Sequence, residues 1–194
     1  MIRIMLVDDH AAVRAGLETV LDREPDLVPV AVTEGNEELW PQYQRTRPDL
    51  VLLDFHLPGQ HSLLICRQLK GLVPTPFVVF YSAYADASLS VPLRLAGADG
   101  LSSKGAPARE LLEVVRRVAA GEQVLPPLSA DLQTAAMEPL SVEERVIAGL
   151  LLAGTSTADI AGVLAVDMAT ARGRIDRLLG RIAADCETAP MRAA

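Results

Sequence analysis

The sequence predicts an α/β protein in which a doubly wound, five-stranded parallel sheet is followed by a small all-α domain. Short apolar runs alternate with segments of helical periodicity over residues 1–122, which favours a parallel sheet covered by helices on both faces. The pattern becomes purely helical from Leu140 onward. A stretch with two adjacent prolines, residues 123–137, lies between these parts and is expected to be a linker.

The central strand of the predicted sheet is the apolar run Leu50–Leu53, which is too short for a helix and ends on Asp54. In open α/β sheets ligands bind outside the carboxyl ends of the strands, so a carboxylate in this place indicates a site. The other strands are expected at 1–7, 27–32, 77–82 and 100–102. Pro29 cannot donate a ladder hydrogen bond, so the strand at 27–32 is expected at an edge of the sheet.

The expected helices of the first part span residues 11–24, 36–47, 62–69, 86–96 and 107–120. Pro41 and Pro92 fall inside two of these ranges and should shorten or kink those helices. The last helix has clear boundaries, because Pro107 stands at its start and Gly121 just beyond its end.

The C-terminal part predicts three helices in the order of a helix-turn-helix domain. Ser141 and Glu144 form a capping box that opens the first helix, and Gly154 ends it. A short helix at 157–164 and a longer one at 169–184 follow. The longer helix has an apolar face made of Ile175, Leu178, Leu179 and Ile182. We expect this domain to span 138–186 and to be followed by a tail at 187–194.

Composition excludes several classes of protein. The formal net charge is −7, with 12 Lys+Arg against 16 Asp+Glu in residues 1–125 and 6 against 9 in residues 126–194, so no part is basic. The chain has no apolar run of about 18 residues and no cationic N-terminal leader, so we expect a cytoplasmic protein without membrane contact. Cys66 and Cys186 are isolated, so buried thiols are expected and not a disulfide.

Five polar residues fall at the expected carboxyl ends of four strands: Asp8, Asp9, Asp54, Ser82 and Lys104. Singly, each is an ordinary turn or surface residue. Together they bring three carboxylates close to one another, which is costly without a cation, and Mg²⁺ is the hard ion that takes oxygen ligands. A metal, an ammonium group, a hydroxyl and a nucleophilic carboxylate are the groups that phosphoryl transfer needs.

Several motifs resemble the receiver domain of a bacterial two-component response regulator. They are VDDH at 7–10, VRAGL at 13–17, PDLVLLDFHLPG at 48–59, the Ser82–Ala83 pair, and AGADG at 96–100 followed by Lys104. The C-terminal stretch LSVEERVIAGLLLAGTSTADIAGVLAVDMATARGRI, residues 140–175, is similar to the LuxR-type helix-turn-helix of the NarL/FixJ class. The resemblance implies a flavodoxin-like receiver and a DNA-binding output domain.

The resemblance also implies a role for each site residue. Asp54 would be the phosphoacceptor. The Mg²⁺ ligands would be Asp8, Asp9, Asp54 and the backbone carbonyl of His56. The residues that hold the phosphoryl oxygens would be Ser82 and Lys104.

The chain departs from the family pattern in both parts. Leu101 stands where receivers usually carry an aromatic residue, and Pro92 lies within the fourth helix. In the output domain the groove-facing positions correspond to Arg172, Gly173 and Asp176, of which one is a cation. Two further candidates for DNA contact, Arg174 and Arg177, lie on a different side of the helix, where they form either a solvated face or phosphate contacts. Ala158 replaces a lysine that the family commonly has.

The sequence thus predicts a response regulator, not an enzyme, that a sensor histidine kinase phosphorylates on Asp54 and that regulates transcription by binding promoter DNA, with a homodimer expected. The alternative is an atypical regulator whose output domain acts through protein contacts. A receiver-like phosphatase or other α/β hydrolase is disfavoured, because nothing outside the five-residue site offers a place for a substrate.

Overall fold

The computed structural model describes the backbone of residues 1–192 and the side chains of residues 1–186. These residues form two compact units. The first contains Met1–Ala85 and Ala98–Leu125, and the second contains Asp86–Gly97 and the chain from Pro126 onward. The expected tail at 187–194 is helical in its backbone as far as Arg192, and residues 193–194 lie outside the described part.

The first unit is built on a five-stranded sheet with the order β2-β1-β3-β6-β7, and all its strand pairs are parallel. The strands are β1 (Ile2–Val7), β2 (Leu27–Thr33), β3 (Leu50–Asp54), β6 (Phe77–Ser82) and β7 (Gly100–Ser103). The expected parallel α/β sheet is therefore confirmed. The sequence does not predict the antiparallel pair β4 (His56–Leu57) and β5 (Gln60–His61) that follows β3.

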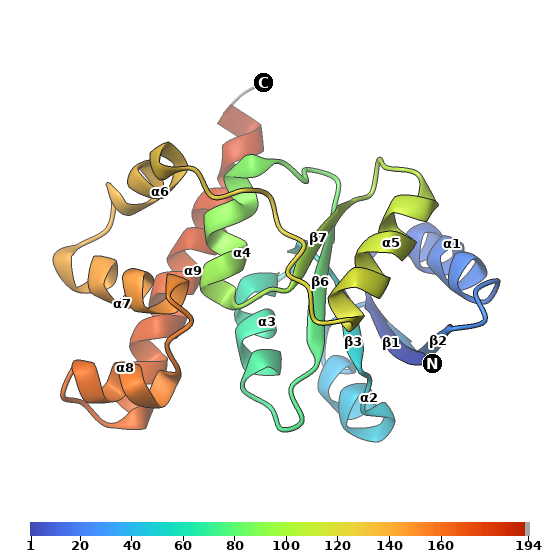
Figure 1. Ribbon diagram of the computed structural model, residues 1–194, viewed down its shortest axis with the longest axis horizontal. Helices are drawn as coiled ribbons and strands as arrows, with labels where there is room; N and C mark the ends of the chain where they lie inside the picture. Colours follow the sequence, from blue (N-terminus) through green and yellow to red (C-terminus); the bar gives the residue numbers. More distant parts are fainter. Residues whose placement is uncertain (193–194) are drawn as a thin grey trace. The chain divides into compact units, whose positions relative to one another are not determined.

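The helices of this unit are α1 (Ala11–Leu21), α2 (Leu39–Thr46), α3 (Ser62–Lys70) and α5 (Ala108–Ala119). Figure 1 shows α1 and α5 together on one face of the sheet and α2 and α3 on the other. The core under α1 and α5 joins strand residues to helix residues: Ile4, Leu6, Leu50, Leu52 and Val79 with Leu17, Leu21, Leu111, Leu112, Val115 and Val118. Alternate residues of the central strands face opposite layers, which explains why these strands are apolar throughout.

Pro29 and Pro41 lie where the missing N–H of proline costs little, and the helix that contains Pro41 is shortened, as expected. β2 is an edge strand, as Pro29 predicts, and its register with β1 shifts between Ile4 and Met5, directly opposite the proline. Pro41 lies in the first turn of a helix that begins at Leu39 and not near Asn36, where its missing N–H costs no helical hydrogen bond.

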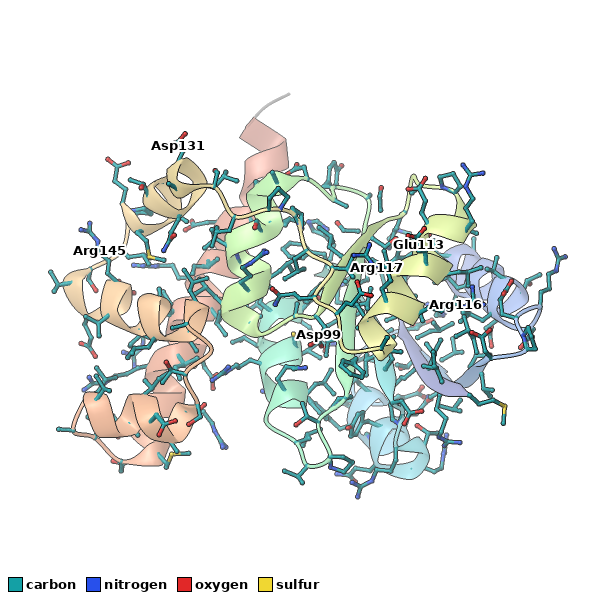
Figure 2. The ribbon with its side chains drawn as sticks, viewed as in Figure 1. Asp99, Glu113, Arg116, Arg117, Asp131 and Arg145 are labelled. Carbon is teal, nitrogen blue, oxygen red and sulfur yellow. The ribbon has the colours of Figure 1, made fainter. Side chains whose placement is uncertain are left out.

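Ion pairs connect α5 to the segment before β2. Arg116 Nη2 lies 2.6 Å from Glu24 Oε2 and 2.7 Å from Asp26 Oδ1, and Figure 2 labels Arg116 on α5. The hydrogen bond from this guanidinium is the main cause that lowers the pKa of Asp26 to about 2.

The second unit is all helical. Its elements are the 3₁₀ helix η1 (Ala87–Leu89), α4 (Ser90–Ala96), α6 (Ala130–Met137), α7 (Val142–Leu152), α8 (Thr157–Val163) and α9 (Met168–Arg192). The buried side chains of α7, α8 and α9 are Ile147, Ala148, Leu151, Ile160, Ala161, Ala171, Ile175, Leu178, Leu179 and Ala183. The predicted apolar face of the last helix is thus confirmed, with Ile182 half-buried beside it.

Residues 86–97, which the sequence places in the receiver, pack with the C-terminal helices in this unit. α4 contacts α7 and α9, and six of its seven residues are buried. A short helix that is apolar on nearly every side must be covered on more than one face. Pro92 lies in the first turn of α4, so it does not interrupt the helix.

The segment that was expected to be a linker contains a helix, α6. Ser129 caps it, because its side chain accepts a hydrogen bond from Leu132 N. At the other end Arg145 of α7 (Figure 2) donates to the carbonyl oxygens of Met137, Glu138 and Leu140 at 2.9–3.0 Å. The expected capping box of Ser141 and Glu144 then opens α7.

Cys66 and Cys186 form no disulfide, as expected, and of the two thiols Cys66 is buried and Cys186 half-buried. No helix among the described residues has the length and apolar character needed to cross a membrane.

Candidate functional site

The polar residues that the sequence assigns to a site lie at one edge of the sheet of the first unit. Asp8 and Asp9 follow β1, Asp54 ends β3, Ser82 ends β6, and Lys104 follows β7. These four strands are parallel neighbours, so their carboxyl ends meet at the same edge. Asp8, Asp54 and Ser82 are buried, with 3% or less of their surface exposed.

Lys104 links the carboxylates of two strands. Its Nζ lies 2.7 Å from Asp8 Oδ2 and 2.6 Å from Asp54 Oδ2. Its position is fixed through the backbone, because Lys104 N donates to Ser82 O at 2.8 Å. The predicted neighbourhood of Asp8, Asp54 and Lys104 is therefore present in the structure.

Burial and charge act on Asp54 in opposite directions. Burial raises the pKa of Asp54 above its ordinary value and the nearby Asp8 carboxylate adds to this, whereas the hydrogen bond from Lys104 lowers it. Burial alone lowers the pKa of Lys104, yet its hydrogen bond to Asp54 and its ion pair with Asp8 raise the pKa above the ordinary value. The ammonium group thus keeps its proton and balances part of a buried negative charge.

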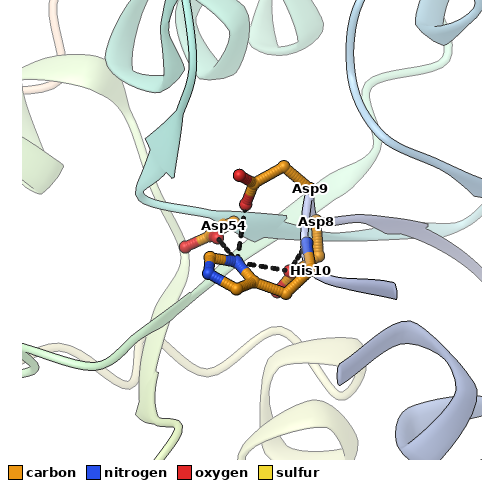
Figure 3. Close-up of side chains that lie close together, drawn as sticks. All are labelled: Asp8, Asp9, His10 and Asp54. Carbon is orange, nitrogen blue, oxygen red and sulfur yellow. Dashed lines mark hydrogen bonds and ion pairs between the residues drawn. The ribbon is translucent and has the colours of Figure 1, made fainter. Parts of the chain in front are cut away.

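The ligand atoms of four residues converge closely enough to share a cation. Single atoms of Asp8, Asp9, His10 and Asp54 all lie within 4.8 Å of one another (Figure 3). Asp8 Oδ2 and Asp9 Oδ1 are buried atoms that accept no hydrogen bond from the described residues. Buried carboxylate oxygens that accept no hydrogen bond suit a hard divalent cation, so the donor set is compatible with a metal.

His10 is the member of this cluster that sequence analysis missed. The sequence feature that could have indicated His10 is its position directly after Asp8 and Asp9, at the turn where β1 ends and α1 begins. A motif alone does not show whether such a side chain turns toward the acids or toward solvent.

His56 lies beside the site but outside the cluster. Its N–H donates to Asp54 Oδ1 at 3.2 Å. Its ring packs instead against Phe55 and Tyr84, with ring centroids 5.1 and 5.8 Å apart. Ser82 Oγ accepts a hydrogen bond from Tyr84 N at 3.1 Å, which holds this loop against the end of β6. The expected ligand role of the His56 carbonyl stays a prediction.

The arrangement offers a carboxylate nucleophile next to positive charge and to a possible cation. Asp54 has an ammonium group at hydrogen-bond distance, a hydroxyl at the end of the next strand, and carboxylates that can hold a divalent ion. Fixed positive groups stabilise charge that develops on transferred oxygens, so this geometry suits phosphoryl transfer to Asp54.

Comparisons with known proteins agree with this geometry. The family model of the response regulator receiver domain matches residues 4–116. The chain is a response regulator. It is 31% identical to the DNA-binding transcriptional activator DevR/DosR of Mycobacterium tuberculosis, over 97% of this chain and 91% of that protein. It is 33% identical to the transcriptional activator protein ExaE of Pseudomonas putida, over 92% and 89%.

A solved structure shares this fold. The two-component response regulator of the LuxR family from Aurantimonas sp. SI85-9A1 has a TM-score of 0.60 and 28% identity, covering 73% of this chain and 99% of that one. Response regulators are signalling proteins, so the expectation that the chain is not an enzyme follows from its family.

The residues of this response regulator that were expected to face DNA lie on α9. Arg172, Gly173 and Arg177 are exposed, whereas Asp176 and Arg174 are half-buried. Arg174 is ion-paired with Glu143, and Arg181 Nη2 lies 3.0 Å from Glu144 Oε2. Two of the four arginines at 172–181 are therefore neutralised by the first turn of α7. Among the described residues, Arg172 and Arg177 have no ion-pair partner.

Proposed function

We propose that this response regulator acts in the cytoplasm, where a sensor histidine kinase phosphorylates it on Asp54. The observation that carries the proposal is the buried Asp54 carboxylate held 2.6 Å from the Lys104 ammonium beside the acidic cluster. A bond forms between an Asp54 oxygen and phosphorus. The bond from phosphorus to its donor breaks, and the donor keeps the electron pair.

The proposal includes Mg²⁺ at this edge of the sheet. Its ligands would be Asp8, Asp9, Asp54 and the backbone carbonyl of His56. The bound ion supplies charge neutralisation for the phosphoryl oxygens. Lys104 offers a second positive charge, and Ser82 offers a hydroxyl that can donate to one of these oxygens. The convergence of single ligand atoms of Asp8, Asp9 and Asp54 within 4.8 Å of one another supports this ligand set.

Labelling by a small phosphodonor tests the first proposal. Asp54→Asn should abolish labelling by acetyl phosphate in Mg²⁺, because a carboxamide cannot form the acyl phosphate. The matched control is Asp49→Asn, which changes an exposed aspartate just before the same strand and keeps an oxygen to accept the hydrogen bond from Arg3 N. Undiminished labelling of Asp54→Asn would place the phosphoryl group elsewhere.

We further propose that residues 1–122 form the receiver and that the helices of residues 138–186 bind promoter DNA and regulate transcription. The relative DevR/DosR, which matches nearly the whole chain, is named a DNA-binding transcriptional activator. The order of α7, α8 and α9 supports a helix-turn-helix in which α9 enters the major groove.

The charge of α9 predicts that a single output domain binds DNA weakly. With Arg174 and Arg181 paired to glutamates, the exposed face offers Arg172 and Arg177 as cations. We expect the monomer to bind near the nonspecific range of about 10⁻⁴ to 10⁻⁶ M at physiological salt. A homodimer on two half-sites would double the phosphate contacts, so phosphorylation would act by controlling that pairing.

A pair of glycine substitutions tests whether α9 lies in the groove. Gly173 and Gly149 are both exposed helix positions with nothing within 4 Å of an added Cβ, on α9 and α7 respectively. Gly173→Lys should tighten DNA binding and steepen the slope of log K against log salt by about 0.9. Gly149→Lys adds the same charge to α7 and should change the slope much less. Equal effects of the two would show that α9 does not face DNA.

A second function is favoured by one observation. Val163 at the end of α8 and Met168 at the start of α9 are large apolar side chains that are 61% and 46% exposed. Gly173 and Ala158, which occupy positions of the expected DNA-binding surface, are exposed as well. A groove-facing surface that is apolar and poor in free cations suits contact with another protein. Steep salt dependence of binding to promoter DNA would favour the first function, and the absence of such salt dependence would favour protein contact.

A further inference from the structure

Arg14 is a charged residue of α1 whose side chain is only 14% exposed. It lies in the first turn of the helix, where its N–H donates to His10 O at 3.1 Å. Side chains on an α-helix tilt toward its amino end, so the guanidinium reaches back over the turn that follows β1. There Nη1 donates to the backbone carbonyl of Asp8 at 2.6 Å, and Nη2 donates to Glu34 Oε1 at 2.8 Å.

The carbonyl that Arg14 contacts lies beyond the ladder of the sheet. The last paired residue of β1 is Val7, which lies opposite Thr33 of β2 and Leu53 of β3. The N–H of Asp8 still donates to Thr33 O at 3.1 Å. Asp8 is 3% exposed, and a buried backbone carbonyl without a donor is costly. Arg14 supplies a donor at the point where the sheet ends.

Arg14 thereby fixes the peptide group between the two acidic residues that follow β1. The peptide unit is planar, so a hydrogen bond to the Asp8 carbonyl also sets the direction of the Asp9 N–H. The side chain of Asp8 is held separately. Its Oδ1 accepts from His10 N at 2.8 Å, and its Oδ2 lies 2.7 Å from Lys104 Nζ. The placement of Asp9 relative to Asp8 therefore depends on the peptide that Arg14 holds.

Glu34 connects this arrangement to β2, the one strand of the five-stranded sheet that supplies none of the expected site residues. It follows β2 directly, and its side chain is 60% exposed. Because Glu34 offsets the charge of Arg14, the pair brings little net positive charge to the acidic cluster. The effect of Arg14 on the site then comes from the geometry of its hydrogen bonds.

We propose that Arg14 is a positioning residue of this site: held by Glu34, it orients the Asp8–Asp9 peptide so that both carboxylates can bind one ion. The inference rests on the metal site proposed above. Loss of a group that orients the ligands of a metal lowers metal affinity by about 10–100-fold. Without Arg14, the two carboxylates keep their charge and lose their fixed relative orientation.

Calorimetric titration of the full chain with Mg²⁺, well below the unfolding temperature, tests the proposal. Arg14→Met should bind Mg²⁺ at least about tenfold more weakly than the wild type. Arg14→Lys keeps the charge, but a compact ammonium cannot bridge two partners as the guanidinium fork does, so its affinity should fall by at least about threefold. The matched control is Arg3→Met, because Arg3 near the start of β1 also donates to a backbone carbonyl, that of Thr46. Its Mg²⁺ affinity should stay within about twofold.

A double substitution shows whether Glu34 acts through Arg14. Glu34→Met alone should lower the Mg²⁺ affinity by at least about threefold. The combined variant Arg14→Met, Glu34→Met should bind Mg²⁺ no more weakly than Arg14→Met, because residues that act in series are not additive. A residue that only stabilises the fold would not change the affinity of the folded protein. If Arg14→Met does not fold, Arg14→Lys and Glu34→Met carry the same test.

The contrary results are equally distinct. Wild-type Mg²⁺ affinity in Arg14→Met would overturn the role of Arg14 and leave the metal site intact. Wild-type affinity in Arg14→Lys would show that charge acts and not position. Equal losses in Arg14→Met and Arg3→Met would show a general loosening of the fold, and additive losses in the double variant would overturn the role of Glu34. A wild type that binds no Mg²⁺ would overturn both this inference and the metal site proposed above.

Discussion

Lys104→Met removes the positive charge that balances two buried carboxylates while keeping the length of the side chain. Lys104 lies within 2.7 Å of both Asp8 and Asp54, whose side chains are 4% and 2% exposed, and is itself 15% exposed. Without the ammonium, both carboxylates remain in the sheet edge without a compensating cation. The variant should therefore be strongly destabilised when no divalent ion is present.

The size of the effect follows from the burial of these groups. Removing one partner of a buried ion pair costs about 3–5 kcal/mol, and the partial exposure of Lys104 favours the lower end, about 3 kcal/mol. For a urea dependence of about 2 kcal/mol per M, the unfolding midpoint should fall by about 1.5 M. Urea unfolding followed by circular dichroism at pH 7 in chelator measures this shift.

Lowering the pH should reduce the difference between the variant and the wild type. Burial raises the pKa of Asp54 in the fold, so the stability linked to this group is present at low pH and is lost as pH rises through that pKa. Lys104→Met removes the hydrogen bond that lowers the pKa of Asp54, so this pKa rises further. The variant should regain stability relative to the wild type as pH falls from neutrality toward 4, while Lys104 of the wild type stays protonated throughout.

Lys70→Met is the matched control, because Lys70 Nζ pairs with Asp99 Oδ2 at 2.8 Å in a more exposed place, with side chains 19% and 21% exposed. It should cost about 1 kcal/mol. Millimolar Mg²⁺ should restore Lys104→Met much more than Lys70→Met, because an ion that binds the folded carboxylates stabilises them. Equal costs of the two substitutions, with no selective rescue by Mg²⁺, would refute the assignment of Lys104 as the compensating charge.

Three further predictions concern packing, capping and thiol reactivity. Gly100→Ala should destabilise the protein by about 1–3 kcal/mol in urea unfolding, because a Cβ there would lie 2.9 Å from a Val118 methyl, whereas Gly16→Ala on α1 meets nothing within 4 Å and should be neutral or stabilising. Ser141→Ala should lower the free energy of unfolding by about 1 kcal/mol near neutral pH, because it removes the N-cap of α7. Hydrogen bonds from Ser141 lower the pKa of Glu144, so their contribution to stability is lost as pH falls through that pKa, and the substitution should cost less in acid. Burial raises the pKa of the Cys66 thiol, so an aromatic disulfide reagent should modify it only at the rate of unfolding; fast modification in the native protein would contradict this burial.

The sequence by itself determined the fold class and the main site. Apolar runs too short for helices can only be buried strands, and in a parallel sheet their carboxyl ends must meet. For this reason the sequence alone places Asp8, Asp54 and Lys104 together, and Pro29 places its strand at the edge. The capping box of Ser141 was equally clear, because capping depends on residues only three positions apart.

Only the tertiary structure decided which charged side chains pair with each other and which helices pack together. The ion pair of Glu143 with Arg174 removes a cation from α9 across 31 positions of sequence, a distance at which no local pattern has predictive value. The turn of His10 toward Asp9, and the packing of α4 with α7 and α9, likewise depend on side-chain orientation and on contacts between distant segments. Periodicity specifies which face of an element is apolar, but the partner that covers this face is selected by the packing of the whole chain.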